Sequence, residues 1–264
     1  MSKSRDIIGK HFDEKALSIS NKNSPYVFFN QTLNKHGSNC YLGHLSDPYR
    51  YAESLFPEDV KNLNILDCCC GTGVFSILPA LNGAFVFGFD ISEESIIFAK
   101  KRADKFGVSD KADFRTMDIS DMNYDQNFFD VAIIYGSLSL MNTEEAIKSI
   151  KKVLKPKGKL IVVDSLGYNP FFNWNRKKSI RRWTNQDTGD YKTFNHKDLG
   201  VLRNNFSSVN YKTYNLTVLI IYYLNRVLRK SLSANYFNLI DKVLLRIPII
   251  KWLAFKIVLV CEDE

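Results

Sequence analysis

A run of small residues follows the first clearly apolar strand of the chain. Asp67, three cysteines, Gly71, Thr72 and Gly73 come directly after residues 63–66 and precede a helix. Glycines let a backbone turn tightly and approach a ligand closely, and the start of the following helix attracts negative groups. The next strand ends at Asp90, whose carboxylate can accept hydrogen bonds from two ribose hydroxyls. These residues predict a site for a nucleoside-containing ligand where two strands end.

Alternating strands and helices must hold these residues in place. We expect strands at 63–67, 84–90, 112–116, 129–135 and 159–164, and helices at 74–81, 93–106 and 143–154. Ser92 and Ser95 with Glu94 are typical of the start of the second of these helices. The strands are almost continuously apolar, which predicts a parallel sheet that is covered on both faces.

The two flanking segments have a looser pattern. Before the sheet, we expect helices at 6–20 and at about 48–60 around a loop-rich cap at 21–46. After residue 164, the segment 166–197 is polar and aromatic. We then expect a helix at 198–205, a strand at 207–218, mostly helix at 219–252 and a closing strand at 254–261. This organisation predicts one α/β domain over residues 1–264, with a cap or lid at 1–60, a core at 61–165 and an insertion-bearing segment at 166–264.

Five segments between residues 63 and 164 resemble, in order, the motifs of the class I S-adenosylmethionine (SAM)-dependent methyltransferases of small-molecule type. They are Asp67-x-Cys69-x-Gly71-x-Gly73, Gly88-Phe-Asp90-Ile-Ser, residues 113–119, Asn127-Phe-Phe-Asp130-Val and residues 153–160. The resemblance implies a Rossmann-like, doubly wound α/β fold. Its sheet would be mostly parallel and seven-stranded with the last strand antiparallel, and it would carry an N-terminal helical cap and a C-terminal helical insertion.

The same resemblance implies SAM as the cofactor, S-adenosylhomocysteine (SAH) as the product, and a set of contacts. These contacts are Asp67, Cys69, Gly71 and Gly73 to the methionine part, Asp90 to the ribose, Ile91 to the adenine face, Asp118 and Ile119 to the adenine edge, and Tyr135 at the methyl-donor end. Cys69 replaces the family's first glycine. Because cysteine is small, we expect the turn to be kept with a lower affinity for SAM. Asp130 is expected to be structural.

A hydroxyl acceptor needs a base, and three side chains are candidates. His44 lies in a segment that resembles the approach to the first motif in small-molecule methyltransferases, and His11 lies on the first expected helix. Tyr168 follows the fifth strand, where the ligand crevice of such a sheet opens. A surface position for His44 stays open, and His196 is expected to begin a helix. We therefore expect transfer to an oxygen atom of a small molecule, or of a lipid- or sugar-linked acceptor.

Composition and charge limit the classes of protein and of binding partner that fit this chain. With 45% hydrophobic and 24% charged residues the chain is an ordinary globular protein and not a disordered one. The net charge of +8 is unevenly spread, because residues 1–164 carry a net −1 and residues 165–264 a net +9. The five cysteines lack disulfide or metal spacing, and the first residues lack a signal-like apolar run, so we expect a reducing cytoplasm and no metal.

The basic third leaves more than one partner open. The segment 219–256 interleaves apolar and basic residues, as in helices that lie on a membrane surface or cover a sheet, and Arg176 to Arg182 adds a basic cluster. We expect a small-molecule acceptor, with an anionic or lipid-linked one left open, and we expect these helices first to cover the sheet or the acceptor pocket. Peripheral membrane contact is the second interpretation and nucleic acid the third. Strand four continues as Tyr135-Gly-Ser, without the Pro-Pro motif of enzymes that methylate amino groups of bases or glutamine. An RNA methyltransferase and a non-catalytic SAM-binding protein remain the alternatives, and the oligomeric state stays open.

Overall fold

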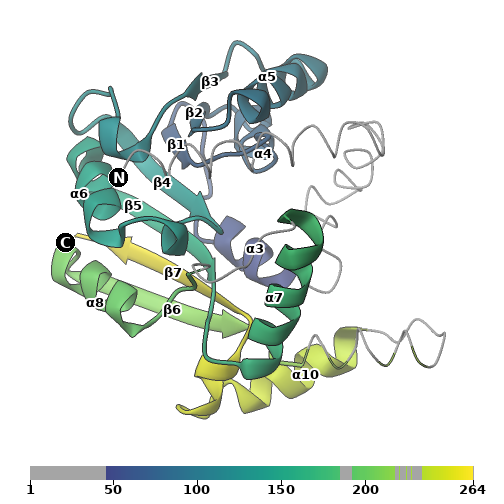
Figure 1. Cartoon of the computed structure of the whole chain (residues 1–264). Helices are drawn as coiled ribbons and strands as arrows, with labels where there is room; N and C mark the ends of the chain where they lie inside the picture. The colour runs from purple at the N-terminus through teal and green to yellow at the C-terminus, as the bar shows by residue number, and fades with distance from the viewer. Residues whose placement is uncertain are drawn as a thin grey trace.

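One seven-stranded sheet organises the part of the chain that the structure describes. The structure, a computed structural model, describes residues 46–184, 192–217, 220, 224, 227 and 234–263. The strand order is β3-β2-β1-β4-β5-β7-β6, as Figure 1 shows. The strands are β1 (Asn64–Cys68), β2 (Phe85–Asp90), β3 (Ala112–Thr116), β4 (Phe129–Tyr135), β5 (Leu154–Ser165), β6 (Ser208–Tyr214) and β7 (Lys256–Glu262).

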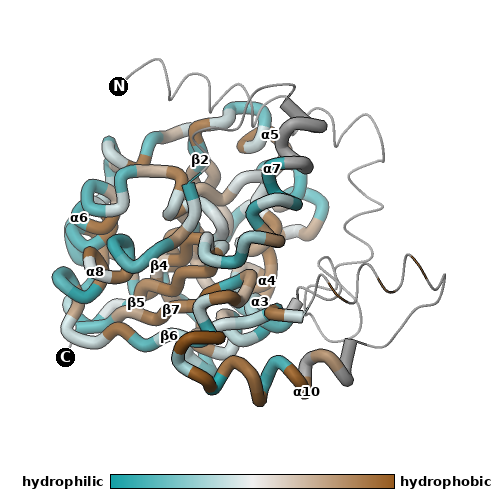
Figure 2. The backbone as a smooth tube through the Cα atoms, turned by 60° about the horizontal axis from the view of Figure 1, so that its bottom comes forward, coloured by the Kyte–Doolittle hydropathy of each residue, from teal (hydrophilic) through white to brown (hydrophobic). Residues whose placement is uncertain are grey.

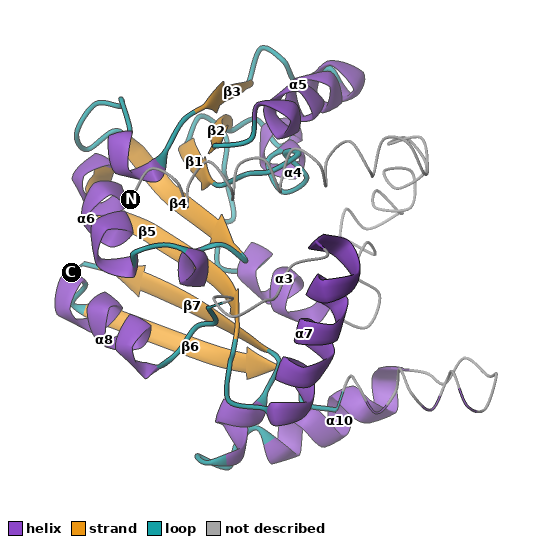
Figure 3. Cartoon of the chain, viewed as in Figure 1, coloured by secondary structure: helices purple, strands orange, loops and turns teal. Residues whose placement is uncertain are grey.

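Strand direction agrees with the predicted Rossmann-like arrangement. Strands β1 to β5 pair in parallel, and β7 is antiparallel to both of its neighbours, β5 and β6. Figure 3 shows the arrowheads of β4 and β6 pointing the same way and β7 pointing back between them. The order reverses at β1, between β2 and β4, so the carboxyl ends of β1 and β4 form the switch point at which such sheets bind ligands.

Helices cover both faces of the sheet. They are α3 (Ser46–Glu53), α4 (Ile77–Leu81), α5 (Glu93–Phe106), α6 (Thr143–Val153), α7 (Pro170–Thr184), α8 (His196–Asn205) and α10 (Ala234–Leu244), with short 3-10 helices η2 (Ile119–Asp121), η3 (Leu138–Leu140) and η4 (Ile250–Leu253). Apolar residues of α3, α4 and α5 share one core cluster with Ile65, Val86 and Ile133. Residues of α6 and α8 share the other with Leu66 and Ile134. Alternate residues of each strand therefore serve the two cores.

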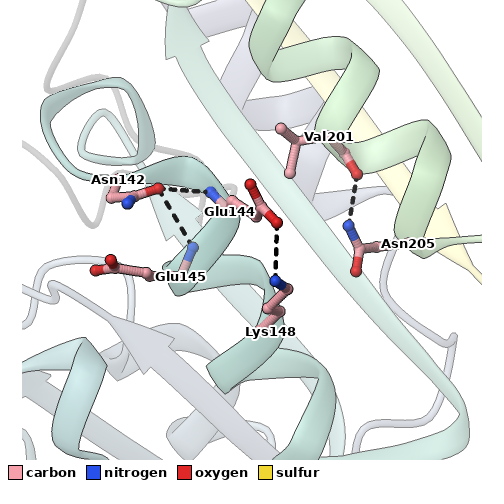
Figure 4. A network of polar contacts seen from close by, with 6 residues as sticks. All are labelled: Asn142, Glu144, Glu145, Lys148, Val201 and Asn205. Atoms are coloured by element: carbon pink, nitrogen blue, oxygen red, sulfur yellow. Dashed lines mark hydrogen bonds and ion pairs between the residues drawn. The ribbon is translucent and has the colours of Figure 1, made fainter.

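Local capping explains where several helices begin. The Ser92 hydroxyl accepts a hydrogen bond from the Ser95 amide at the start of α5, and Gly107 ends this helix in the left-handed conformation. At α6 the Asn142 side chain accepts from the amides of Glu144 and Glu145, and Lys148 pairs with Glu144 one turn on, as drawn in Figure 4. On the neighbouring α8, Asn205 donates to the Val201 carbonyl.

The structure differs from several of the expected boundaries, and strand β6 ends at Tyr214 instead of residue 218. Helix α3 stops at Glu53 instead of continuing to about residue 60, because turns that precede Pro57 interrupt it. Helix α4 starts at Ile77 and not at residue 74, because the turn after β1 continues through residue 76. Strand β5 begins at Leu154 instead of residue 159, and its register with β4 shifts between Phe129 and Val131.

Helix α7 was not anticipated in the polar segment 166–197. The Asn169 side chain accepts hydrogen bonds from the amides of Phe171 and Phe172, and Pro170 occupies the first helical position. An Asn-Pro pair in this arrangement is a good helix start, so the local signal was present. The predicted helix at 6–20 and the cap at 21–46, up to residue 45, lie outside the described residues. No helix in the described ranges is both long and apolar enough to cross a membrane.

Candidate cofactor and acceptor site

The turn after β1 has the left-handed backbone that its glycines predict. Cys69, Gly71 and Gly73 have φ angles of 56°, 53° and 69°. The Cys70 amide donates to the Phe89 carbonyl of β2 at 2.9 Å, which holds the turn against the neighbouring strand. A Cβ atom on Gly73 would approach Ala99 and Phe114 at 3.0 Å, whereas one on Gly71 would meet nothing within 4 Å. Gly73 thus permits close packing, and the Cβ direction of Gly71 is open.

Asp90 lies against this turn at the end of β2. Its Oδ2 accepts a hydrogen bond from the Gly71 amide at 2.9 Å, and its Oδ1 accepts from the Ser92 amide at 3.0 Å. The residue is 8% exposed. Two backbone donors therefore fix the orientation of the carboxylate beside the open side of the glycine turn, where the sequence places the ribose.

Asp67 is the second acid of the site and is buried. Its Oδ2 accepts a 2.5 Å hydrogen bond from the Ser76 hydroxyl. Burial raises the pKa of Asp67 to about 7, although the Ser76 hydrogen bond lowers it in part and the nearby charge of Asp90 raises it further. This carboxyl group therefore exchanges its proton near neutral pH.

The expected adenine-side residues follow β3. The Met117 amide donates to the Asp90 carbonyl, which brings the end of β3 next to Asp90. Asp118 caps η2, its Oδ1 accepting from the amide and hydroxyl of Ser120 at 2.8 Å each. Ile119 is buried in the core, and Ile91 is half-buried directly after Asp90. The structure therefore brings Asp118 to the Asp90 side of the site, and its contact with adenine stays a prediction.

The cysteines of the turn are neutral thiols. Burial raises the pKa of Cys69, and the charges of Asp90, Asp67 and Asp118 raise it further, which places all three acids around this one residue. Burial likewise raises the pKa values of Cys68 and Cys70. A protonated thiol is a poor nucleophile and metal ligand. Within the described ranges, no group of three or more His, Cys, Asp or Glu side chains could hold a metal ion.

An aromatic cluster lies beside Asp67 at the end of β4. Tyr135 packs edge-on against Phe75 and Tyr49, with ring centroids 4.8 and 5.8 Å away, and these two rings are stacked on each other at 5.1 Å. The Tyr135 hydroxyl is buried without a hydrogen-bond partner among the described residues. Burial raises the Tyr135 pKa, and the charges of Asp67 and Glu53 raise it further. The predicted donor-end residue therefore lies close to both acids and has an unused donor.

Glu53 is an acid that our sequence reasoning missed. It is the last residue of α3, and burial raises its pKa to about 7, with Arg50 opposing. It lies one helical turn after Tyr49, and this spacing puts both residues on the face of α3 that covers the sheet. The i, i+4 spacing of Tyr49 and Glu53 indicates a shared helix face. It does not show that this face covers the end of the sheet, so the sequence alone could not assign Glu53 to the site.

The three candidate bases are not brought together by the described residues. His44 and His11 lie outside the described part of the chain. Tyr168 is 37% exposed, and its hydroxyl oxygen accepts a 2.8 Å hydrogen bond from the His196 amide. Its ring lies 5.1 Å from the His196 ring and 5.8 Å from that of Trp252, so its contacts are with α8 and η4. A catalytic role for Tyr168 stays a prediction.

Two other acids hold strands together. Asp130, expected to be structural, accepts from Lys155 Nζ at 2.6 Å and from the Asn64 amide at 2.9 Å, so it links β4 to β5 and β1. Asp164, at the end of β5, is buried and accepts from the amide and hydroxyl of Ser139. Neither acid lines the glycine turn.

Known proteins resemble this chain in the same region. The family model described as "Methyltransferase domain" matches residues 59–199. The sterol 4-C-methyltransferase of Caenorhabditis elegans is 30% identical over 118 residues, which are 44% of this chain and 35% of that protein. The ubiquinone/menaquinone biosynthesis C-methyltransferase of Blochmanniella pennsylvanica is 32% identical over 38% of this chain and 41% of its own. The alignments thus span less than half of each relative.

A solved structure shares the fold over nearly all of the chain. Geranyl diphosphate C-methyltransferase from Streptomyces coelicolor A3(2), solved with Mg2+, geranyl-S-thiolodiphosphate and SAH, has a TM-score of 0.62, 14% sequence identity and 98% coverage of both chains. At this identity the likeness concerns the fold alone. The family model, which matches more than half of the chain, is the stronger finding. With its glycine turn and the acid at the end of β2, the chain belongs to the class I SAM-dependent methyltransferases.

Proposed function

We propose that this protein transfers a methyl group from SAM to a small apolar acceptor. The observation that carries the proposal is the hydrogen bond from the Gly71 amide to the Asp90 carboxylate. This bond fixes the carboxylate next to the open side of the glycine turn. When bound, SAM supplies an electrophilic methyl group on a sulfonium. Asp90 would hold the ribose, Asp67 and the backbone at Cys69, Gly71 and Gly73 the methionine part, and Asp118, Ile119 and Ile91 the adenine.

The aromatic cluster suits the methyl-donor end of this site. Tyr49, Phe75 and Tyr135 form an apolar wall beside Asp67, and aromatic faces attract a cation such as a sulfonium. The wall also excludes water, which supports an in-line transfer that depends mainly on positioning. Glu53, with a pKa of about 7, would accept the proton that the acceptor loses.

Carbon is the acceptor atom that the relatives favour. Their names describe C-methylation of a sterol and C-methylation in ubiquinone/menaquinone biosynthesis, whereas the sequence analysis predicts oxygen. The oxygen assignment is not confirmed, and it stays the second candidate because Glu53, with its pKa of about 7, suits a hydroxyl acceptor equally well. An experiment that decides between them is transfer from methyl-labelled SAM to components of a cell extract, with the labelled product identified by mass spectrometry and NMR. Absence of any labelled product would contradict the proposed activity and favour a binding protein without turnover, and labelled RNA would favour an RNA methyltransferase.

The affinity for SAH should depend on pH through Asp67. A raised pKa means that Asp67 is protonated below about pH 7, and pairing with the ligand's ammonium group requires the ionised form. Affinity should therefore fall as pH drops below 7, by up to about tenfold per pH unit, and level off above it. Isothermal titration calorimetry on either side of pH 7 measures this, and Asp67→Asn should bind weakly without the slope. Glu53→Gln is the matched control and should keep the slope; loss of the slope in that variant alone would assign the effect to Glu53 instead.

We also propose that the acceptor is presented at a membrane surface. Helix α10 and the residues after it expose large apolar side chains, among them Val243 at 60% and Ile249 at 81%, together with the cations Lys242 and Arg246. Figure 2 shows α10 as an apolar segment at the margin of the molecule. Asp241 ties α10 to the end of β6 through the amides of Leu216 and Thr217, so the helix is held in place. Exposed apolar residues with interspersed cations fit the headgroup region of anionic lipid.

Vesicle binding tests this surface. Val243→Asp with Ile249→Asp should lower the fraction pelleted with vesicles of phosphatidylcholine and phosphatidylglycerol by about tenfold, because apolar contact is lost and negative charge is added. Binding should also be weaker to phosphatidylcholine alone. The matched control is Leu81→Asp with Ile97→Asp, which changes two exposed apolar residues of α4 and α5. Equal losses in the two double variants would contradict a specific role for α10.

A further inference from the structure

Lys256 is a buried lysine at the edge of the sheet where the parallel strands end. It is the first residue of β7, which is antiparallel to β5, and it lies opposite Ser165. The residue is only 8% exposed. Two positions on, Val258 belongs to the same core cluster as Tyr49, so Lys256 extends on the face of the sheet that α3 covers. The chain thus places a positive charge under α3, on the acceptor side.

The surroundings of this ammonium group are aromatic. Lys256 Nζ lies 5.9 Å from the centroid of Tyr49 and 5.5 Å from that of Phe255. Burial raises the pKa of Asp164, and the positive charge of Lys256 is the strongest of the influences that lower it. The oxygens of Asp164 accept hydrogen bonds from Ser139 and Ser165 and none from Lys256. Across the described ranges, no carboxylate lies within ion-pair distance of Nζ. An ammonium group that lies among rings at the edge of the sheet, with no carboxylate of the described residues in ion-pair contact, is suited to receive an anion.

A second cation shares one of these rings. The Arg176 guanidinium of α7 lies 5.8 Å from the centroid of Phe255, and the Phe172 ring lies 4.9 Å from it. Arg176 also donates hydrogen bonds to Asn173 Oδ1 and to the Leu166 carbonyl, which hold its guanidinium group near this ring. Lys256 and Arg176 therefore give the ring of Phe255 two positive neighbours from different elements.

Tyr49 joins this charged edge to the methyl-donor end. Its ring is 5.9 Å from Lys256 Nζ and 5.8 Å from the Tyr135 ring, which lies beside Asp67. We propose that Lys256, with Arg176 near the same Phe255 ring, binds the anionic group of an apolar acceptor whose skeleton lies along Tyr49 towards Tyr135. The group is a carboxylate, phosphate or sulfonate on an apolar skeleton. The inference rests on the proposed function for the direction of the skeleton, but the anion subsite can be tested without SAM.

A pair of fluorescent probes tests the subsite. Anilinonaphthalene sulfonate and phenylnaphthylamine share one aromatic skeleton, and only the first carries an anion. Lys256→Met keeps most of the apolar stem and removes the charge, so it should weaken binding of the sulfonate by about tenfold or more and leave the neutral probe within about twofold. Lys256→Arg should keep most of the sulfonate affinity. Arg176→Met should weaken the sulfonate alone as well, and it keeps the test available if Lys256→Met does not fold.

The matched control is Lys148→Met, which removes one exposed charge from α6 and should change neither affinity. Equal weakening of both probes by Lys256→Met would assign Lys256 a packing role and overturn the proposal, as would an unchanged sulfonate affinity. A loss of sulfonate affinity in Lys148→Met as large as that in Lys256→Met would make the effect one of net charge and overturn the proposal too. SAH titration of the same samples is read separately: failure to bind SAH contradicts the proposed function, whereas the probe pair reports on the subsite alone.

Discussion

Asp90→Ala is expected to weaken SAH binding by about 100-fold or more. The substitution removes a charged acceptor that can take hydrogen bonds from two ribose hydroxyls, each worth about 1.5–3 kcal/mol. It also removes the acceptor of the Gly71 amide, so the glycine turn loses the hydrogen bond that fixes its orientation next to the ligand. Isothermal titration calorimetry with SAH measures the loss, and methyl transfer should fall with it.

The control for Asp90 is a neighbouring acid with a different role. Asp113, on β3, pairs with Arg115 at the surface, so Asp113→Ala should bind SAH within about twofold of the unchanged protein. Thermal unfolding of both variants separates loss of the ligand from loss of the fold. An unchanged titration curve for a folded Asp90→Ala protein would remove Asp90 from the cofactor site and with it the main support for the proposed function.

Gly88→Ala should lower the free energy of unfolding by about 2–4 kcal/mol. A Cβ atom at this position would lie 2.6 Å from two ring atoms of Phe114 and 3.1 Å from the sulfur of Cys70. Phe114 is buried, so its ring has no room to withdraw, and overpacking of a rigid core costs about 1–3 kcal/mol or more. Urea unfolding followed by circular dichroism measures the change.

Gly200→Ala should raise the free energy of unfolding, which is the opposite of the effect expected for Gly88→Ala. Gly200 lies within α8, and a Cβ atom there would meet nothing within 4 Å. Alanine should therefore stabilise the protein by about 0.5–1 kcal/mol through its helix propensity. Partial restoration of Gly88→Ala by Phe114→Leu would confirm that the ring is the obstacle, and a Gly88→Ala protein of unchanged stability would contradict the packing argument.

Local signals predicted the central elements well. Helix α5 is expected at 93–106 from its serine cap and is observed at Glu93–Phe106, and β3 and β4 lie at the expected residues 112–116 and 129–135. The turn after β1 and Asp90 could be placed for the same reason, since strand, turn, helix and strand succeed one another within a short stretch of chain. Neighbours in sequence are neighbours in space here, so the motif carries its own geometry.

The acceptor side could not be predicted in the same way. Glu53 and Lys256 lie about 200 positions apart, and each becomes part of the site only because α3 packs across β5, β6 and β7. Sequence spacing contains no signal for such a meeting. Tyr168 follows β5 as expected, but its contacts could not be predicted. Its hydroxyl accepts a hydrogen bond from the His196 amide, and its ring contacts Trp252, and both residues belong to later elements.

The place of β7 between β5 and β6 has a consequence for synthesis of the chain. Strand β6 is made before β7, but its partner in the sheet is β7, so β6 and the outer edge of β5 stay unpaired until the later strand leaves the ribosome. At about 5–20 residues per second, this interval lasts several seconds. Two open strand edges and an apolar α10 are exposed together during that time, so we expect newly made chains to need chaperone protection until β7 closes the sheet.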